Sequence, residues 1–228
     1  MSGHLYIVST PIGNLKDISS RALTTLSEVD LIACEDSRVS RKLLSHYKIK
    51  NKLITYNNFN EINMVKKIYN YLLEDKNIAL ISDAGTPCIS DPGYRLVNLA
   101  TLKKIKVFSI PGPSSVHAAL SISGLPTDNF FFQGFLPKKK GRKTKFETLK
   151  ELECTIILFE SPKRIKKTFK DIHFYLGNRV VSVCKEITKI YEKVYLDDID
   201  KIIDFFDDIN PKGEYVILIA KENYKLSL

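Results

Sequence analysis

Residues 81–93, with the sequence ISDAGTPCISDPG, combine polar side chains that bind ligands with glycines and prolines that shape a backbone. They follow an apolar run, residues 78–81, which has the length and β-branched content of a buried strand. Gly85 and Gly93 let a ligand approach the main chain, and the two prolines between them stiffen its path. Ordinary connections between a strand and a helix are shorter than this one. We therefore predict a rigid ligand loop rather than a plain connection.

The net charge of +9 is concentrated in one part of the chain. Residues 138–170 hold twelve Lys or Arg against four Glu, a net of +8. One cluster, KKKGRKTK at 138–145, contains glycine and no apolar residue, which predicts an exposed loop. The second cluster consists of lysines at the spacing of one helix face, Lys163, Lys166, Lys167 and Lys170. Two adjacent cationic clusters favour a polyanion partner, RNA first, over a merely solvated surface.

Strands and helices alternate through the first half of the chain. Apolar runs predict strands at residues 5–8, 31–34, 53–56, 78–81 and 106–110. Stretches with apolar residues at helical spacing separate them, so we expect an α/β fold with a mostly parallel sheet and helices on both faces. The pattern changes at GLPTD, near residue 124, which predicts an N-terminal domain at 1–123 and a C-terminal domain at 124–228. Strands of the second domain are expected at 130–132, 155–159, 180–184, 194–196 and 214–220.

Polar loops follow four of the first-domain strands, at residues 9–15, 35–38, 82–93 and 111–115. The carboxyl ends of parallel strands meet at one edge of a sheet, so these loops should form one cleft. We expect the second domain, where further polar residues follow strands, to close the cleft around a small ligand. The sequence has no GxGxxG turn, Walker A loop, nucleophile elbow or metal-ligand spacing of His or Cys. No segment has the pattern of a signal peptide or membrane span, so we expect a cytoplasmic protein with reduced thiols.

A series of short motifs runs in one order over nearly the whole chain: STPIGNLKDIS, EDSR, SDAGTPCISDPG, IPGPSS, GFLPKKKGR, FESPKR, KEITK and KGEYVIL. This series resembles the ribosomal RNA small subunit methyltransferase I family of the tetrapyrrole-methylase-like superfamily. The resemblance implies a two-domain fold, with a mostly parallel sheet in the N-terminal domain and a mixed sheet in the C-terminal domain. It also implies a homodimer that uses S-adenosyl-L-methionine to methylate the 2′-hydroxyl of a cytidine in the decoding region of 16S ribosomal RNA.

The same resemblance implies which positions bind the cofactor. The expected set is Ile12, Gly85, Thr86, Ile89, Ser114, Ser115, Phe159, Cys184 and Lys185. Main-chain groups around Gly85 and the hydroxyls of the two serines suit the amino acid end and the ribose, and the second-domain residues suit the adenine. The chain departs from the family pattern at Ser37, Phe159 and Lys163, where Thr, Tyr and His are common. Many members also continue with a short helical extension.

Methyl transfer from a sulfonium depends mainly on holding the acceptor oxygen, methyl carbon and sulfur in line, and needs no metal. A ribose hydroxyl is a weak acid, so a base, or a charge that lowers its pKa, would help. Ionisable candidates at the ends of strands are Glu35, Asp36, Asp83, Glu186 and Lys189. For any single one of them a helix cap or an ion pair is the somewhat better expectation, and the sequence does not choose the base.

The basic clusters are the expected RNA-binding surface, namely Lys138, Lys139, Lys140, Arg142, Lys143, Lys163, Arg164, Lys166, Lys167 and Lys170. Two alternatives stay open. A tetrapyrrole methyltransferase would share fold and cofactor but methylate a ring carbon of an anionic porphyrinoid. An RNA-binding module without catalysis would not bind the cofactor at all.

Overall fold

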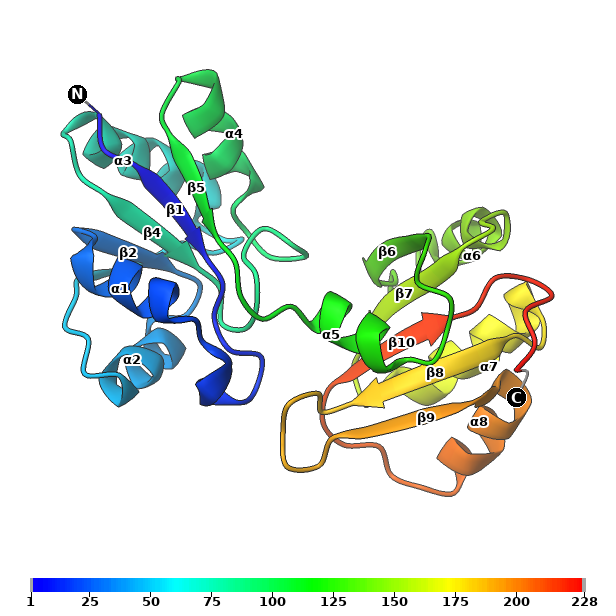
Figure 1. Cartoon of the computed structure of the whole chain (residues 1–228). Helices are drawn as coiled ribbons and strands as arrows, with labels where there is room; N and C mark the ends of the chain where they lie inside the picture. Colours follow the sequence, from blue (N-terminus) through cyan, green and yellow to red (C-terminus); the bar gives the residue numbers. More distant parts are fainter. Residues whose placement is uncertain (1, 227–228) are drawn as a thin grey trace. The chain divides into compact units, whose positions relative to one another are not determined.

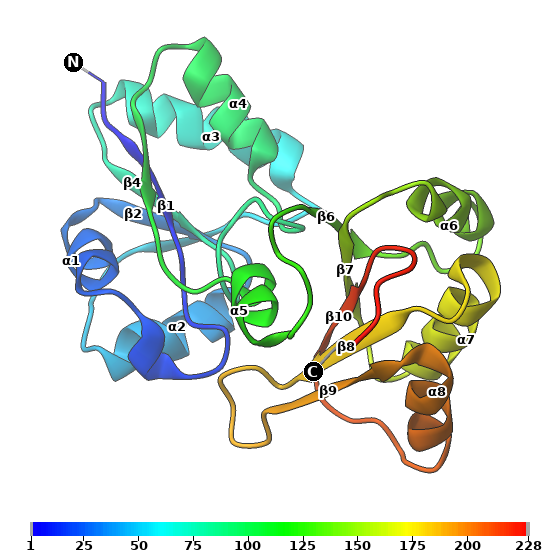
Figure 2. The same cartoon turned by 45° about the vertical axis from the view of Figure 1, so that its right-hand side comes forward.

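The computed structural model describes residues 2–226. Contacts divide the chain into two compact units, one ending at Ser114 and the other beginning at Ser115 (Figures 1 and 2). Helix α5 (Ser115–Ile122) therefore groups with the second unit. The domain boundary at residues 123–124 stays a prediction from the sequence.

The first unit is a parallel α/β sheet. Its elements are β1 (Leu5–Val8), η1 (Leu15–Asp17), α1 (Ser20–Glu28), β2 (Leu31–Cys34), α2 (Ser37–His46), β3 (Leu53–Thr55), α3 (Glu61–Leu73), β4 (Ile78–Ile81), α4 (Tyr94–Leu102) and β5 (Val107–Ile110). The strands lie in the order β3-β2-β4-β1-β5, and each neighbouring pair is parallel. This confirms the predicted parallel sheet.

Strand β4 shows why helices cover both faces of this sheet. Side chains alternate between the faces of a strand, and all four residues of β4 are apolar and buried. Ile78 and Leu80 join the core formed with α3 and α4, whereas Ala79 and Ile81 join the core formed with α1 and α2. Burial on both faces explains why the sequence of β4 is continuously apolar. It also fixes the position of Ile81, after which the loop begins.

The second unit is a mixed sheet. Its further elements are β6 (Phe130–Phe135), α6 (Arg142–Lys150), β7 (Thr155–Glu160), α7 (Ile165–Leu176), β8 (Val180–Lys185), β9 (Lys193–Asp198), α8 (Ile199–Asp207) and β10 (Tyr215–Ile219). The order is β6-β7-β10-β8-β9, with β6 and β7 parallel and the other pairs antiparallel. Helices α6, α7 and α8 share one core with this sheet. The predicted mixed sheet is confirmed.

Two details of the basic clusters differ from the sequence prediction. The exposed loop expected at 138–145 ends at Gly141, because α6 begins at Arg142. Phe146 and Leu149, one turn apart and fully buried, give α6 an apolar stripe too narrow to stand out among its charged residues. Lys163 lies in the turn before α7 rather than on the helix.

Candidate functional site

The candidate site lies where the strands of the first unit end. Because β1, β2, β4 and β5 are parallel and in register, their carboxyl ends meet at one edge of the sheet. The polar loops predicted from the sequence start there, after Val8, Cys34, Ile81 and Ile110. In open α/β sheets this edge is where ligands bind.

The loop after β4 is tied to the loop after β1 by a short backbone bridge. Thr10 N donates to Gly85 O at 2.9 Å, and Gly85 N donates to Thr10 O at 3.0 Å. The Thr10 hydroxyl, which is buried, also donates to Ser82 O at 3.2 Å. Gly85 therefore has a fixed place beside Thr10, which lies in a predicted cleft loop but is not among the predicted site residues.

Thr86 joins this bridge to the loop after β5. Its hydroxyl donates to Pro113 O at 3.1 Å and lies 3.0 Å from the hydroxyl of Ser9. Since the only hydroxyl hydrogen of Thr86 goes to Pro113, Ser9 donates to Thr86. Three loops are thus joined through one threonine.

Gly85 has a conformation and surroundings that favour glycine. Its φ is +82°, and a Cβ at this position would lie 3.1 Å from Ile12 Cγ2 and 3.7 Å from Pro113 O. Gly112 is similarly close, because its Cβ would lie 3.0 Å from Ser9 Cβ. The loops after β1, β4 and β5 are therefore closely packed at Gly85 and Gly112, where a side chain would crowd Ile12 and Ser9.

Glu61, at the start of α3, fixes the far end of the loop. One of its carboxylate oxygens accepts from Gly93 N at 3.2 Å and from the Tyr56 hydroxyl at 2.9 Å, and the other pairs with Arg95 at 3.2 Å. Gly93 has φ +141°, and a Cβ there would meet Cys88 Sγ at 2.5 Å. Sequence reasoning missed Glu61, because no local pattern shows that a helix start anchors a loop thirty residues later.

Carboxylates gather at the same edge with different proton affinities. Burial raises the pKa of Glu35, and the nearby Asp91 and Asp83 raise it further. Burial also raises the pKa of Asp83, and likewise that of Asp91. Asp36 is the exception: its side chain caps α2 and bonds to Arg38, which lowers its pKa to about 2. Asp91 lies in the predicted ligand loop but is not among the predicted ionisable candidates.

Asp36 and Asp83 are linked directly, since Asp36 N donates to Asp83 Oδ1 at 3.0 Å. The structure therefore brings together Glu35, Asp36 and Asp83 of the predicted catalytic set, with Ile12, Gly85 and Thr86 of the cofactor set at the same edge. Ser114 follows β5 and is half-buried, whereas Ile89 is 48% exposed on the loop after β4.

The other predicted site residues lie in the second unit. Glu186 and Lys189 form an ion pair of 2.9 Å in the turn between β8 and β9, and Lys189 also pairs with Glu214 at 2.9 Å. Burial opposes ionisation of Glu186, but the hydrogen bonds from Lys189 and the Glu214 backbone, with the charges of Lys189 and Lys185, together outweigh it and lower the Glu186 pKa. The same partners raise the Lys189 pKa against the effect of burial.

The predicted adenine-contacting residues differ in exposure. Phe159 is half-buried and packs edge-on against Phe132 and Phe135. The Cys184 thiol is fully buried, 3.9 Å from Ala119 O, and burial raises its pKa to about 11. Lys185 and, at the start of α5, Ser115 are half-buried. Phe159, Lys185 and Ser115 are therefore the more accessible of these predicted contacts.

The predicted RNA-binding residues separate into two groups. Lys138, Lys139, Lys140, Lys163 and Lys167 are exposed, and within residues 2–226 none of them forms an ion pair. The rest have acidic or carbonyl partners: Lys143 with Glu147, Lys166 and Lys170 with Asp207, Arg164 with Glu160, and Arg142 with Asp171. Arg142 is buried rather than exposed.

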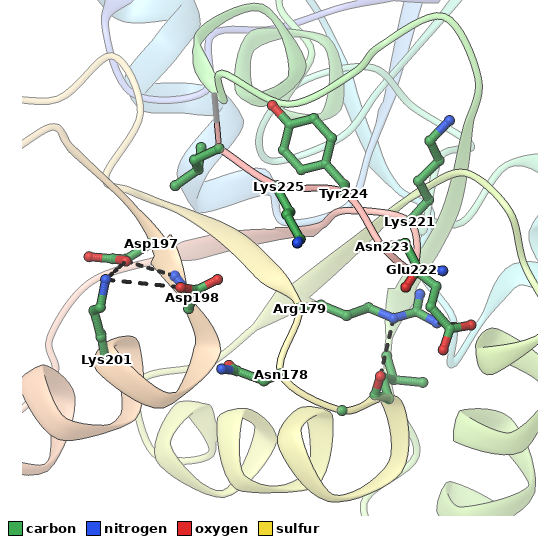
Figure 3. A pocket seen from close by; sticks show the side chains of 13 residues that line it. Asn178, Arg179, Asp197, Asp198, Lys201, Lys221, Glu222, Asn223, Tyr224 and Lys225 are labelled. Carbon is green, nitrogen blue, oxygen red and sulfur yellow. Dashed lines mark hydrogen bonds and ion pairs between the residues drawn. The ribbon is translucent and has the colours of Figure 1, made fainter. Parts of the chain in front are cut away.

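A pocket of about 620 Å³ lies elsewhere in the second unit, beside the segment 221–226 (Figure 3). Lys201 pairs with Asp197 at 2.8 Å, and Arg179 donates to Leu176 O at the end of α7, whereas Arg179 Nη1 is buried without a hydrogen-bond partner in the described part of the chain. The bond from Arg179 Nε to Leu176 O caps the end of α7. Among residues 2–226 there is no cluster of His, Cys, Asp or Glu suited to a metal, and no described helix is long and apolar enough to cross a membrane.

Comparison with known proteins places this geometry in a family. Residues 4–203 match the family model of the Tetrapyrrole (Corrin/Porphyrin) Methylases. A protein of Thermotoga maritima named ribosomal RNA small subunit methyltransferase I is 42% identical, over 96% of this chain and 98% of its own. Proteins of the same name from Halalkalibacterium halodurans and Mesomycoplasma conjunctivae are 44% and 45% identical, over 98% and 99% of this chain and 78% and 94% of theirs.

Solved structures show the same fold at low identity. A diphthine synthase matches with a TM-score of 0.77 at 14% identity, over 98% of this chain and 92% of its own. A cobalt precorrin-4 methyltransferase matches with a TM-score of 0.69 at 21% identity, over 95% and 94%. The strand-end edge, the tied loops and the similarity over nearly the whole length lead to one conclusion: this chain belongs to the tetrapyrrole methylase family and, within it, to the ribosomal RNA small subunit methyltransferase I group.

Proposed function

We propose that this protein uses S-adenosyl-L-methionine to methylate the 2′-hydroxyl of a cytidine in the decoding region of 16S ribosomal RNA. The observation that carries the proposal is the identity of 42% to 45%, over nearly the whole chain, to proteins named ribosomal RNA small subunit methyltransferase I. The rigid loop edge and the unpaired lysines of the second unit are what such a reaction requires of a protein.

The residues at the strand-end edge fit the proposed cofactor. A Cβ at Gly85 would crowd Ile12, which supports a requirement for glycine, and so for accessible main-chain groups, at this edge. Main-chain donors there, with the hydroxyl of Ser114, suit the carboxylate and ribose of a cofactor. When bound, the cofactor supplies an electrophilic methyl group. The protein contributes position, because the ties of Thr86 and Thr10 hold the edge in one conformation.

The five candidate ionisable groups are not equivalent as bases. Asp36 has a pKa of about 2 and little affinity for a proton, and Glu186 is similarly tied to Lys189. Lys189 stays protonated between two carboxylates, so it offers a positive charge instead. Glu35 and Asp83 have raised pKa values and lie at the edge, which makes them the better candidates for accepting the ribose proton.

The exposed lysines of the second unit suit an RNA backbone. Lys138, Lys139 and Lys140 follow one another in a short exposed segment, and Lys163 and Lys167 are exposed near the start of α7. Contacts of this kind carry no sequence information, so they hold the RNA while other features select the nucleotide.

Methyl transfer to small ribosomal subunits tests the proposal. The purified protein is incubated with labelled S-adenosyl-L-methionine and subunits that lack the modification, and the digested RNA is analysed by mass spectrometry. We expect the label on a cytidine 2′-oxygen, and better transfer to subunits than to an isolated hairpin, since the target must be held splayed out. A methyl group on a base atom, or equal rates on hairpin and subunit, would contradict the proposal.

Two comparisons sharpen this test. Methylation of uroporphyrinogen in place of RNA would favour a tetrapyrrole methyltransferase, and no cofactor binding by calorimetry would favour a non-catalytic RNA-binding module. Asp83→Asn and Glu35→Gln are expected to lower kcat, while the matched Asp36→Asn retains it. The homodimer and the cytoplasmic location stay predictions, and sedimentation of the purified protein tests the first.

A further inference from the structure

A buried ionic network links the FESPKR and GFLPKKKGR segments of the second unit. Glu160, whose side chain is 0% exposed, accepts from Arg164 Nε at 2.7 Å and Nη2 at 2.9 Å. The Thr168 hydroxyl donates to the same carboxylate at 2.7 Å and accepts from Arg142 Nη2 at 2.9 Å. Arg142 Nε then pairs with Asp171 at 2.7 Å.

Both arginines also reach the main chain just before the lysines. Arg164 Nη2 donates to Leu136 O and Arg142 Nη1 donates to Pro137 O, each at 3.1 Å. The backbone N–H of Arg142 donates to Lys139 O at 3.2 Å, and Gly141 between them is left-handed with φ +79°. The segment 136–141 is therefore held at its start by bonds to the carbonyls of Leu136 and Pro137, and at its end by the turn at Gly141.

The charges of this network cancel. Two arginines face two carboxylates, Glu160 and Asp171, and the Arg142 side chain is only 9% exposed. Thr168 is fully buried. The network therefore adds no net charge to the surface, and its arginines can bind a phosphate only by giving up bonds to Glu160 or Asp171. Within the segment 136–141, the charge available to RNA comes from Lys138, Lys139 and Lys140, which form no ion pair in the network.

We propose that Arg142, Arg164 and Thr168 are positioning residues that hold the segment 136–141 in one conformation, so that its three lysines are preorganised for the RNA backbone. The proposal rests on the proposed function, which supplies the RNA. Arginine suits the task because its planar group donates in several fixed directions, which a lysine at the same place cannot do. Preorganisation lowers the conformational entropy that binding would otherwise lose.

Two substitutions separate positioning from direct contact. Arg142→Lys keeps the positive charge but loses most of the hydrogen-bond donors of the guanidinium group. If Arg142 acted only by attracting a phosphate, this change would have little effect, whereas a positioning role would be lost. Thr168→Val removes a hydroxyl that no RNA can touch. We expect each to weaken binding of small subunits about fivefold, the equivalent of one hydrogen bond. The slope of the logarithm of affinity against the logarithm of salt concentration should stay unchanged in both variants. Thr168→Ser, which keeps the hydroxyl, should bind with the affinity of the wild type.

A matched control excludes a general loss of stability. Thr155 is also buried and donates to Pro126 O at 2.6 Å, away from the segment 136–141. Thr155→Val should lower the Tm as Thr168→Val does, but leave RNA affinity unchanged. Hydrogen exchange should become faster at residues 138–141 in Thr168→Val and not in Thr155→Val.

The outcomes distinguish this inference from the proposed function. Replacing Lys138, Lys139 and Lys140 with Ala should weaken binding and flatten its salt dependence. The slope of log affinity against log salt concentration should fall by about 0.7–0.9 for each phosphate that the variant no longer neutralises. If that variant binds weakly but folded Arg142→Lys and Thr168→Val bind like the wild type, only the positioning role is overturned. If the lysine variant binds normally, the RNA role of the segment is overturned, and the positioning role with it.

Discussion

Gly85 offers the sharpest test of the rigid strand-end edge. Its φ of +82° is a conformation that costs an L-residue about 1–2 kcal/mol. The new Cβ of Gly85→Ala would also lie 3.1 Å from Ile12 Cγ2, closer than ordinary contact. Overpacking of this size costs about 1 kcal/mol. We therefore expect Gly85→Ala to lower the free energy of unfolding by about 2–3 kcal/mol, which a folded domain survives.

A double-mutant cycle separates the two contributions. Ile12→Ala removes the crowding methyl group, so Gly85→Ala should cost about 1 kcal/mol less in that background than in the wild type. Gly141→Ala is the control for the backbone contribution alone, because Gly141 has φ +79° and nothing lies within 4 Å of its Cβ position. Urea denaturation, monitored for each variant, gives these free energies.

The same site predicts a binding phenotype. Gly85→Val should abolish binding of S-adenosyl-L-methionine in calorimetry while far-UV circular dichroism stays native, because the branched side chain would press against Ile12 and displace the edge that the cofactor should meet. A Gly85→Ala variant as stable as the wild type, or an energetic coupling of zero with Ile12, would refute the crowding argument. Unchanged cofactor affinity in folded Gly85→Val would refute the ligand loop itself.

Three further predictions concern the carboxylates. Burial, and then Asp91 and Asp83, raise the pKa of Glu35 in the folded protein, so the wild type loses stability as the pH rises from the Glu35 pKa of the unfolded chain to that of the folded protein. Urea denaturation should therefore show Glu35→Gln to be more stable than the wild type by up to about 1 kcal/mol at neutral pH and equally stable in acid. Burial opposes ionisation of Glu160, but its hydrogen bonds outweigh this and lower its pKa in the folded protein. The stability that ionised Glu160 contributes is therefore present at neutral pH and is lost as the pH falls through this lowered pKa. Glu160→Gln should lower the free energy of unfolding by about 3 kcal/mol at neutral pH and by progressively less in acid. Asp36→Ala should lower the Tm by removing the α2 cap, whereas Asp36→Asn, which keeps an acceptor, should not; equal Tm values would contradict the cap.

Strands β2, β4 and β10 could be predicted from the sequence because each is a run of buried apolar residues bounded by turn residues. Helix α6 could not be placed, since Phe146 and Leu149 are its only fully buried apolar residues among charged ones. The loop after β4 could be predicted from Gly85 and its neighbours, because glycine and proline affect the backbone conformation at their own positions and need no distant partner.

Contacts between distant segments explain what the sequence did not predict. Glu61 binds a glycine at the far end of the ligand loop, and Ser9 meets Thr86, which no spacing in the sequence indicates. Arg142 looks like its neighbouring lysines until Asp171 and Thr168 come beside it in the folded unit. Burial of a charged side chain depends on partners, and partners are a property of the tertiary fold.

The strand orders have a consequence for how the protein folds. The central strand of the first sheet is β4, which lies between β2 and β1, both synthesised earlier. The central strand of the second sheet is β10, the last strand within residues 2–226. Neither sheet can grow outward from its centre, and during synthesis β7 and β8 present unpaired edges until β10 enters between them. Such edges are prone to aggregate, and pairings between distant segments form slowly. Folding of the second unit should therefore be a single late event, which requires the chain to be complete to Ile219.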